Sequence, residues 1–449
     1  MFRRIRLLLG ISVFWLALSI LLDGVNTLVL PVQISNLSSQ ATRATALGLL
    51  TFIGLLLGAF VQPVAGALSD RWKPALGRKG FISIGLVLIL FSLFFFAAFR
   101  NLPGVILGYL FIQISASIAQ AGQQSLIPDL VEEKQRGMAS GLKGFMDMAG
   151  AMLGFVILGQ LLGSSRISLA LGVIAAILVG TWLLAALLTP EDKPSQDRAS
   201  PTETIALTRL FRLDLTQQAA FKSLLAARFL FLFGVYAIGR FLLFFVADRL
   251  GLDPNQAAEQ AGLLLGGLAF VTILASPLTG WLTDRIGRIP LMVGGAILGA
   301  GSALLLIWAA SSAQILIFGS LMSLGTAAFG SGSWAMLADV VPRQESARYF
   351  GLANFSTAGP TAAAGLLGPA IDWVNQLYPG NGYTLLFIVS ALAFAVSILP
   401  LRNLTRNDGG RNANGEKEGT HAPGLAVLSV PADPASVEKD DQDPPGGTA

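Results

Sequence analysis

The sequence contains no cysteine and only one histidine. Without cysteine the chain has no disulfide, no thiolate metal site and no cysteine nucleophile. The single histidine, His421, lies in a polar C-terminal segment, which argues against zinc, haem and histidine-dependent acid–base chemistry. No phosphate-binding Walker A sequence and no catalytic constellation occurs either. We therefore expect no metal, no cofactor and no enzymatic activity.

Charged residues are also scarce. Only 12% of the residues are charged, 53% are hydrophobic, and the mean hydropathy is +0.67. A soluble domain carries about 25% charged residues, so the composition argues against a soluble enzyme, a nucleic-acid binder or a disordered chain. The 50 glycines and 21 prolines suit bent, closely packed membrane helices. The sequence predicts an all-α, multi-pass membrane protein.

Long stretches with little or no charge provide twelve candidate membrane spans. The first six lie at 7–31, 44–69, 81–99, 101–128, 148–165 and 167–190. The second six lie at 224–247, 261–283, 289–338 (two spans with a turn near 311–314), 349–371 and 373–401. We expect a six-helix bundle over 1–190, a cytoplasmic linker over 191–222, a second bundle over 223–401 and a disordered cytoplasmic tail over 402–449.

The positive charges predict the orientation. If both termini lie in the cytoplasm, 23 of the 30 lysines and arginines fall in cytoplasmic segments and four in outer loops. Lysine and arginine gather on the cytoplasmic side of membrane proteins. We therefore expect a cytoplasmic N-terminus, a cytoplasmic C-terminus and residence in the cell membrane.

The two halves repeat one another. The segment PVAGALSDR at 63–71 returns as PLTGWLTDR at 277–285, an offset of 214 residues. Gly77 and Arg78 return as Gly287 and Arg288 at an offset of 210, and Asp129 then returns as Asp339. Six predicted helices separate the copies, so both copies start on the same side of the membrane. The halves are predicted to be parallel repeats related by an axis along the membrane normal.

At these residues the chain resembles the major facilitator superfamily, whose signature is a Gly-x-x-x-Asp-Arg-x-Gly-Arg loop between helices two and three, echoed between helices eight and nine. The resemblance implies two six-helix bundles around a central cavity, with alternating access by rocking. It also implies that the loops act as a cytoplasmic latch; a positive-inside loop with its counter-charge is the alternative. The predicted gate residues are Gly66, Asp70, Arg71, Gly77, Arg78, Asp129, Gly280, Asp284, Arg285, Gly287, Arg288 and Asp339.

The extended first-half loop, 61–81, and the segment 120–141 look like the sucrose and glycoside–pentoside–hexuronide branch of that superfamily. By register, the proton-linked aspartate and the sugar-contacting arginine of plant-type sucrose transporters fall at Gln113 and Gln124. The sodium-coupled relatives carry an aspartate where this chain has Gln62. Only Gln120 keeps the residue type of the branch. The substrate and the coupling ion of that branch therefore cannot be transferred to this chain.

Ionisable residues inside membrane spans are costly and mark functional sites. Asp23 in the first span is predicted to bind a sugar hydroxyl pair or to carry a proton, and the alternative is a structural ion pair. Asp147 is a second candidate coupling carboxyl; an ion pair with Lys143, one turn earlier, is equally open. Arg240 is predicted to pair with Asp23 across the two halves or to bind an anionic substrate. Arg228 is expected to snorkel toward the cytoplasmic end of its span.

Uncharged polar residues complete the predicted site. Gln113, Ser117, Gln120 and Gln124 recur at helical spacing and form one stripe. Amides both donate and accept hydrogen bonds, which suits sugar hydroxyls, while bonding between helices is the even alternative. Asn26 and Asn354 are further candidates.

We predict a secondary transporter that takes up a neutral sugar or glycoside, with proton coupling through Asp23 or Asp147. The alternatives are a proton-linked exporter of drugs or metabolites with the same fold, and a membrane sensor that transports nothing. The expected partners are a small sugar-like molecule, protons and the lipid bilayer, with no nucleic acid. A monomer suffices for this fold.

Overall fold

The computed structural model describes residues 2–132, 135–190, 219–340, 356–402 and 404, and every regular element in these ranges is a helix. Eleven of the described helical segments are long and apolar enough to cross a membrane. The remaining predicted span, 349–371, lies partly outside the described residues. Its described part is helical at 356–363 and continues through η5 (Ala364–Leu367) into α13 (Gly368–Leu377). The predicted all-α membrane fold is confirmed.

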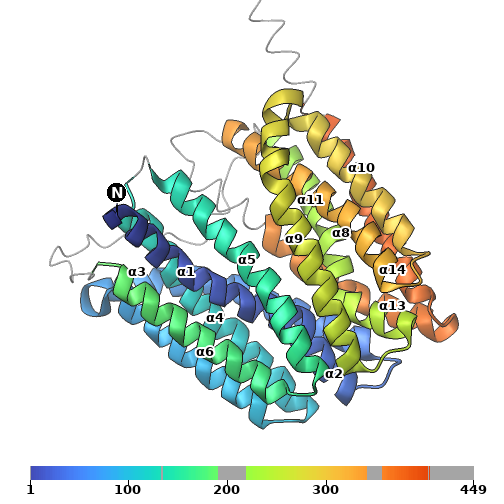
Figure 1. Ribbon diagram of the computed structural model, residues 1–449, viewed down its shortest axis with the longest axis horizontal. Helices are drawn as coiled ribbons and strands as arrows, with labels where there is room; N and C mark the ends of the chain where they lie inside the picture. Colours follow the sequence, from blue (N-terminus) through green and yellow to red (C-terminus); the bar gives the residue numbers. More distant parts are fainter. Residues whose placement is uncertain (1, 133–134, 191–218, 341–355, 403, 405–449) are drawn as a thin grey trace, which may run out of the picture. The chain divides into compact units, whose positions relative to one another are not determined.

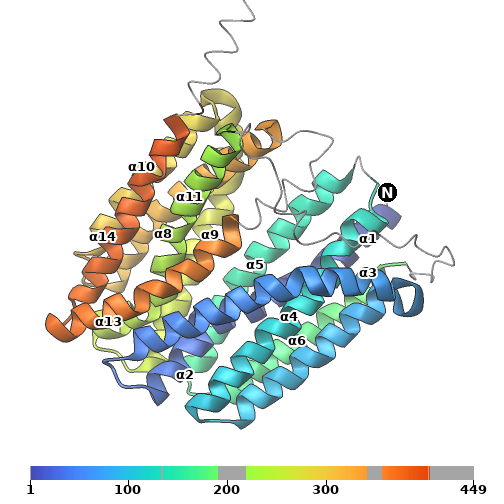
Figure 2. The ribbon, with the colours of Figure 1, turned by 180° about the vertical axis from the view of Figure 1, so that it is seen from behind.

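The first half of the chain, residues 2–188, is coloured blue to green in Figure 1. Its elements are α1 (Phe2–Gly24), η1 (Val25–Val29), α2 (Leu30–Leu37), α3 (Arg43–Ala98), α4 (Leu102–Leu130), α5 (Arg136–Gly163) and α6 (Ile167–Leu188). The long α3 contains two predicted spans and crosses the front of the view from behind (Figure 2).

The second half begins at residue 219. Its elements are α8 (Ala219–Leu250), α9 (Pro254–Ile286), α10 (Arg288–Leu306), α11 (Ser312–Val340), η5, α13 and α14 (Asn381–Val396). α10 ends and α11 begins around the turn predicted near 311–314. An aromatic cluster packs this half: the rings of Phe231 and Phe329 stack at 3.9 Å, and Phe394 lies 5.0 Å from Phe231. Residues 191–218 of the predicted linker, most of the tail and His421 lie outside the described residues. The last four residues of the predicted linker, 219–222, are helical and belong to α8, so the second half begins earlier than predicted.

Two glycines join the spans at the duplicated motif. We expected a loop at each copy, but α3 departs from helical conformation only at Gly77, with φ of 66°. Gly287 separates α9 from α10 with φ of 89°. Positive φ values are costly for side chains with a Cβ atom, so both positions require glycine. These two glycines are 210 residues apart, which is the offset that relates the two copies of the motif, so the repeat extends to the backbone conformation.

The ends of several helices are closed by side chains. Asn101 accepts from the main-chain nitrogen of Gly104 at the start of α4, and Asp253 accepts from two nitrogens at the start of α9. Lys79 donates to carbonyls at the end of α6, and Arg249 to carbonyls just past α10. Cations at these termini also complement the negative end of the helix dipole.

The two halves contact one another at one end, which we call the closed end. It carries residues 38–42, 164–166, 251–253 and 378–380. Here α3 packs on η5 and α13, and α5 packs on α9. Glycines permit both contacts: a Cβ built on Gly48 would overlap the carbonyl oxygen of Gly365, and one on Gly262 would overlap the carbonyl oxygen of Phe155. We call these contacts the two glycine seams. The opposite end, with residues 70–78, 129–132, 284–288 and 339, is called the motif end.

Candidate functional site

The duplicated motif forms matching ion pairs in the two halves. Arg78 donates to Asp129 at 2.8 Å and to Asp70 at 2.6 Å, and Lys73 donates to Asp129 at 2.9 Å. In the second half Arg288 pairs with Asp339. Both arginines directly follow the positive-φ glycines. The glycine therefore turns the chain so that the next side chain reaches the aspartate at the end of the following span.

Each of these pairs lies within one half of the chain. Asp70, one of the predicted gate residues, pairs with Arg78, and its side chain is 64% exposed. No ion pair engages Asp284 in the described residues, while Arg285 stacks on Trp281 at 4.5 Å. A Cβ atom added to Gly66 or Gly280 would meet open space.

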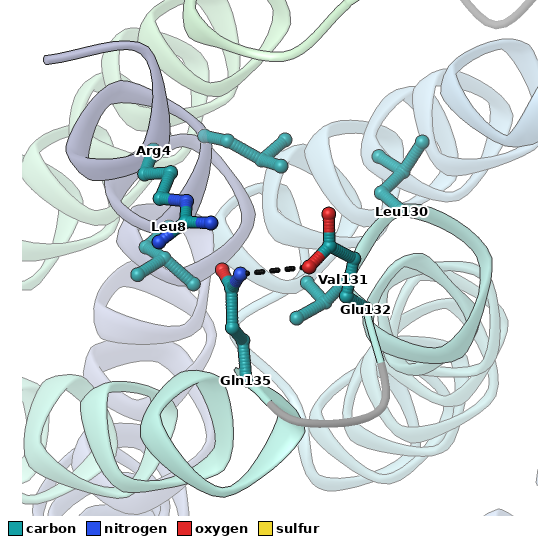
Figure 3. A pocket seen from close by; sticks show the side chains of 7 residues that line it. Arg4, Leu8, Leu130, Val131, Glu132 and Gln135 are labelled. Carbon is teal, nitrogen blue, oxygen red and sulfur yellow. Dashed lines mark hydrogen bonds between the residues drawn. The ribbon is translucent and has the colours of Figure 1, made fainter. Parts of the chain in front are cut away.

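A pocket of about 180 Å³ lies at the motif end between α1, the end of α4 and the start of α5. Figure 3 shows Arg4 and Leu8 facing Glu132 and Gln135 across it, with Gln135 donating to Glu132 at 3.0 Å. Its lining contains none of the predicted substrate or coupling residues, so we do not place the substrate there.

The predicted substrate residues of α1 lie beside a π-helical turn. α1 ends at Gly24, and the next five residues form η1. Asp23 accepts a hydrogen bond from Ser19 at 2.6 Å. Asn26, inside η1, accepts from Tyr109 at 2.8 Å and from Gln113 at 3.2 Å. π-helical turns within α-helices are frequent at functional sites, because they turn neighbouring side chains to new directions.

Arg240 of the second half reaches this turn of the first half. It is 6% exposed and donates to the main-chain oxygen of Asn26 at 3.4 Å. Its Nε atom is buried and has no hydrogen-bond partner in the described structure. No ion pair joins Arg240 to Asp23, although their charges are close enough to interact. Arg240 thus reaches across the halves to the main chain of Asn26 and does not form the predicted ion pair with Asp23.

The amide stripe of α4 divides into two parts. Gln113 is buried and donates to Tyr109 at 2.6 Å as well as to Asn26, and Ser117 donates to the carbonyl oxygen of Gln113. Gln124 is exposed and Gln120 is half-buried. The buried part of the stripe therefore binds helix to helix. Asn354 lies outside the described residues.

Lys143 and Arg228 have surroundings that the sequence did not predict. Lys143 is stacked over the ring of Trp15 at 3.8 Å and makes no ion pair with Asp147 in the described structure. Asp147 is half-buried on α5, close enough to Asp23 for their charges to interact. Arg228 was expected to snorkel, but it is buried at 3% exposure.

A polar cluster at the closed end was not predicted. Arg43 pairs with Asp248 of the second half, and Tyr383 donates to the same carboxylate at 2.7 Å. Asp372 of α13 accepts from the main-chain nitrogens of Ala44 at 3.3 Å and Thr45 at 2.6 Å. Arg43 lies 205 positions from Asp248, and Ala44 lies 328 positions from Asp372, and all of these residues are outside the repeated motif. The available signal was the presence of Arg43 among only four arginines in the predicted outer loops.

Comparison with known proteins identifies the relatives of this architecture. The sequence profile of the Major Facilitator Superfamily matches residues 7–258 and again 224–435. The multi-drug resistance efflux pump PmrA of Streptococcus pneumoniae is 25% identical over 391 residues, covering 82% of this chain and 89% of the pump. The probable nitrate/nitrite transporter NarK2 of Mycobacterium tuberculosis is 26% identical over 386 residues, covering 81% of this chain and 88% of NarK2.

Solved structures share the fold. A bacterial homologue of the human lysosomal transporter Spinster superposes with a TM-score of 0.68 at 16% identity, covering 90% of this chain and 97% of the homologue. The nucleoside transporter NupG superposes with a TM-score of 0.67 at 15% identity, covering 89% of this chain and 99% of NupG. At these identities the likeness concerns the fold alone.

Proposed function

Because the chain belongs to the major facilitator superfamily, and is therefore a multi-pass secondary transporter, we propose that it exports small amphipathic molecules in exchange for protons. The observation that carries this proposal is the contact between Arg240 and the main chain of Asn26. It places a buried cation of one half against the π-helical turn of the other, beside Asp23. Alternating access requires a binding site between two halves that contact one another at one end at a time. The charged site described here lies between two halves that contact one another at the closed end.

The motif end is the cytoplasmic end in this proposal. Most of the lysines and arginines outside the spans belong to the segments on that side. The closed end then faces outward, and its glycine seams and ion pair hold the outer side shut. Each ion pair of the duplicated motif joins residues of the same half in this structure. When the closed end opens, the two copies of the motif would move toward one another.

Proton coupling is assigned to Asp23 and Asp147. Asp23 has one hydrogen-bond donor, Ser19, and no ion-pair partner in the described structure. Intramembrane carboxyls without a fixed counter-ion are suited to gain and lose protons during transport. Substrate contacts are assigned to Arg240, whose Nε atom is unpartnered, and to Gln120 and Gln124, which remain accessible on α4.

Export is favoured over sugar uptake by the hydrogen bonding of α4. A sugar site needs several amides whose donors and acceptors are open to hydroxyl groups. Gln113, predicted to be central to such a site, already bonds Asn26 and Tyr109. The multi-drug efflux pump that is similar over most of this chain supports the same choice.

Uptake of a neutral sugar or glycoside is the second candidate. The observation in its favour is the uncharged cluster of Asn26, Tyr109 and Gln113, which would bind hydroxyl groups if these bonds exchanged with substrate. The paired motif, which serves a cycling protein, argues against a membrane sensor that transports nothing.

The direction of coupling separates the candidates. The full chain is reconstituted in proteoliposomes, with protein-free vesicles as the control. We expect ethidium or carboxyfluorescein to accumulate in vesicles with an acidic lumen and a protonophore to abolish this. Accumulation of labelled sucrose from an acidic exterior, with neither dye moving, would establish the sugar symporter instead. If neither dye nor sugar moves, both assignments are wrong.

A further inference from the structure

Arg228 is a buried cation that the transport site described above does not use. It lies on α8, twelve residues before Arg240, and is 3% exposed. At a rise of about 1.5 Å per residue the two arginines are about 18 Å apart along the helix, with Arg228 nearer the motif end. Twelve residues also rotate the side chain by about 120° around the helix. Arg228 therefore belongs to a separate place inside the second half.

All described partners of Arg228 are uncharged. Its Nη1 atom donates to the hydroxyl of Ser333 at 2.6 Å, and Nε donates to the hydroxyl of Ser356 at 3.4 Å. The guanidinium carbon lies 4.4 Å from the centre of the Trp334 ring. No carboxylate pairs with Arg228 in the described residues, and no hydrogen bond there engages Nη2.

Two other arginines that bridge elements of this fold do have carboxylate partners. Arg43 pairs with Asp248, and Arg78 pairs with both Asp70 and Asp129. A buried guanidinium cannot lose its proton, so it needs a negative partner or strong acceptors to offset the loss of water. Two serine hydroxyls and an indole face offset only part of this cost. A negative group supplied from outside the chain would complete the site.

The chemistry of the site indicates which anion. A single guanidinium carries one positive charge and presents paired N–H donors that match a carboxylate. Phosphate carries nearly two negative charges, of which a single guanidinium balances only about one. The indole of Trp334, 45% exposed, lies beside the guanidinium and offers an apolar surface.

We infer that Arg228, Ser333 and Trp334 bind a substrate that combines a carboxylate with an aromatic or aliphatic body. The carboxylate lies on the guanidinium, and the body lies against the indole. This inference rests on the proposed function, since it names the class of amphipathic molecule that the transporter takes from the cytoplasmic side. It also provides a substrate contact about 18 Å from Arg240, in keeping with a first binding step before the central site.

Equilibrium binding to the purified full chain tests the inference. The probe is 2-naphthoate, and the matched neutral probe is 2-naphthalenemethanol, which has the same ring and no charge. We expect wild-type protein to bind the carboxylate at least tenfold more tightly than the alcohol. Arg228→Gln should weaken naphthoate at least tenfold and leave the alcohol unchanged, while Arg228→Lys should retain part of the preference.

Arg249→Gln is the control variant, because Arg249 bonds only main-chain carbonyls just past α10 in the described structure. It should bind both probes as the wild type does. If Arg228→Gln does not fold, Arg228→Lys and Ser333→Ala carry the test, and each should lower naphthoate affinity severalfold. Equal affinity for the two probes in the wild type, or naphthoate binding that no Arg228 variant changes, overturns the inference.

This outcome is distinguishable from failure of the proposed function. Proton-driven ethidium transport together with Arg228-independent naphthoate binding leaves the exporter in place and removes the carboxylate site. Arg228-dependent naphthoate binding without transport of any probe supports the site and contradicts the exporter.

Discussion

The carboxylate of Asp372 accepts a hydrogen bond of 2.6 Å from the main-chain nitrogen of Thr45. Asp372 belongs to α13 in the second half, and Thr45 lies in the first turn of α3 in the first half. Thr42, the residue before α3, provides no side-chain cap of its own. The start of α3 is therefore capped by a carboxylate from the opposite half. A cap of this kind can form only while the closed end is closed.

Asp372→Ala should therefore open the closed end. Removing a capping carboxylate costs about 0.5–2 kcal/mol, which would raise the population of the open state by a factor of about 2 to 30. The measurement uses the natural absence of cysteine: Thr51→Cys, buried beside the seam at Gly365, reacts with a membrane-impermeant maleimide only when the seam opens. Asp372→Ala should accelerate that reaction severalfold.

Asn101→Ala is the matched control, because Asn101 caps α4 within its own half. It loses a comparable cap without touching the contact between halves. If both variants accelerate labelling of Thr51→Cys equally, capping across the halves has no special role.

Replacing a glycine of either seam by a larger residue should prevent the closed end from closing. Gly262→Val would force side-chain atoms onto the carbonyl oxygen of Phe155 and the Cα atom of Gly159. Backbone atoms cannot yield as flexible side chains do, so we expect the closed end to stay apart and transport to fall at least tenfold. The same substitution at Gly172 on α6, where an added Cβ meets nothing, should leave transport near wild type. Full transport by Gly262→Val would refute the seam.

Arg78 should contribute far more to stability than Arg71. The Arg78 side chain, 6% exposed, bonds two carboxylates and the hydroxyl of Ser69. Its replacement by glutamine leaves Asp129 with only Lys73, and we expect a loss of about 1.5–3 kcal/mol. Arg71 is exposed, and Arg71→Gln should change stability by less than about 0.5 kcal/mol. Thermal unfolding in detergent compares them, and equal effects would contradict this account of the motif.

Asp23→Asn should separate proton coupling from substrate movement. Asparagine still accepts a hydrogen bond from Ser19 but cannot bind and release a proton. We expect accumulation driven by a proton gradient to disappear while exchange of labelled for unlabelled substrate continues. Ser19→Ala keeps the carboxyl and should keep the coupling. Intact gradient-driven accumulation in Asp23→Asn would assign coupling elsewhere, with Asp147 as the next candidate.

The repeat made the two copies of the motif predictable from the sequence. The offset of 210 residues matches Arg78 with Arg288 and Asp129 with Asp339. The structure pairs the arginine with the aspartate in each half, a contact that the repeat alone did not predict. The composition likewise sufficed for the helical membrane fold, because apolar runs of span length have few alternatives in lipid.

The contacts between halves were not predictable in the same way. Arg43, Asp248 and Asp372 carry no repeat partner and no local spacing that links them. Arg228 was misjudged for a related reason: its position near a helix end suggested snorkelling, while its burial depends on Ser333 and Trp334, more than 100 residues away. Tertiary packing decides such positions, and a single sequence does not report it.

Alternating opening of the two ends is the central claim, and paired spin-label distances test it most directly. One pair joins Arg166→Cys to Asn381→Cys at the closed end, and the other joins Arg71→Cys to Ile286→Cys at the motif end. We expect the first distance to lengthen and the second to shorten together when pH and substrate are changed in the cycling protein. If both distances stay fixed under every condition that supports transport, the two halves do not rock, and the account is wrong.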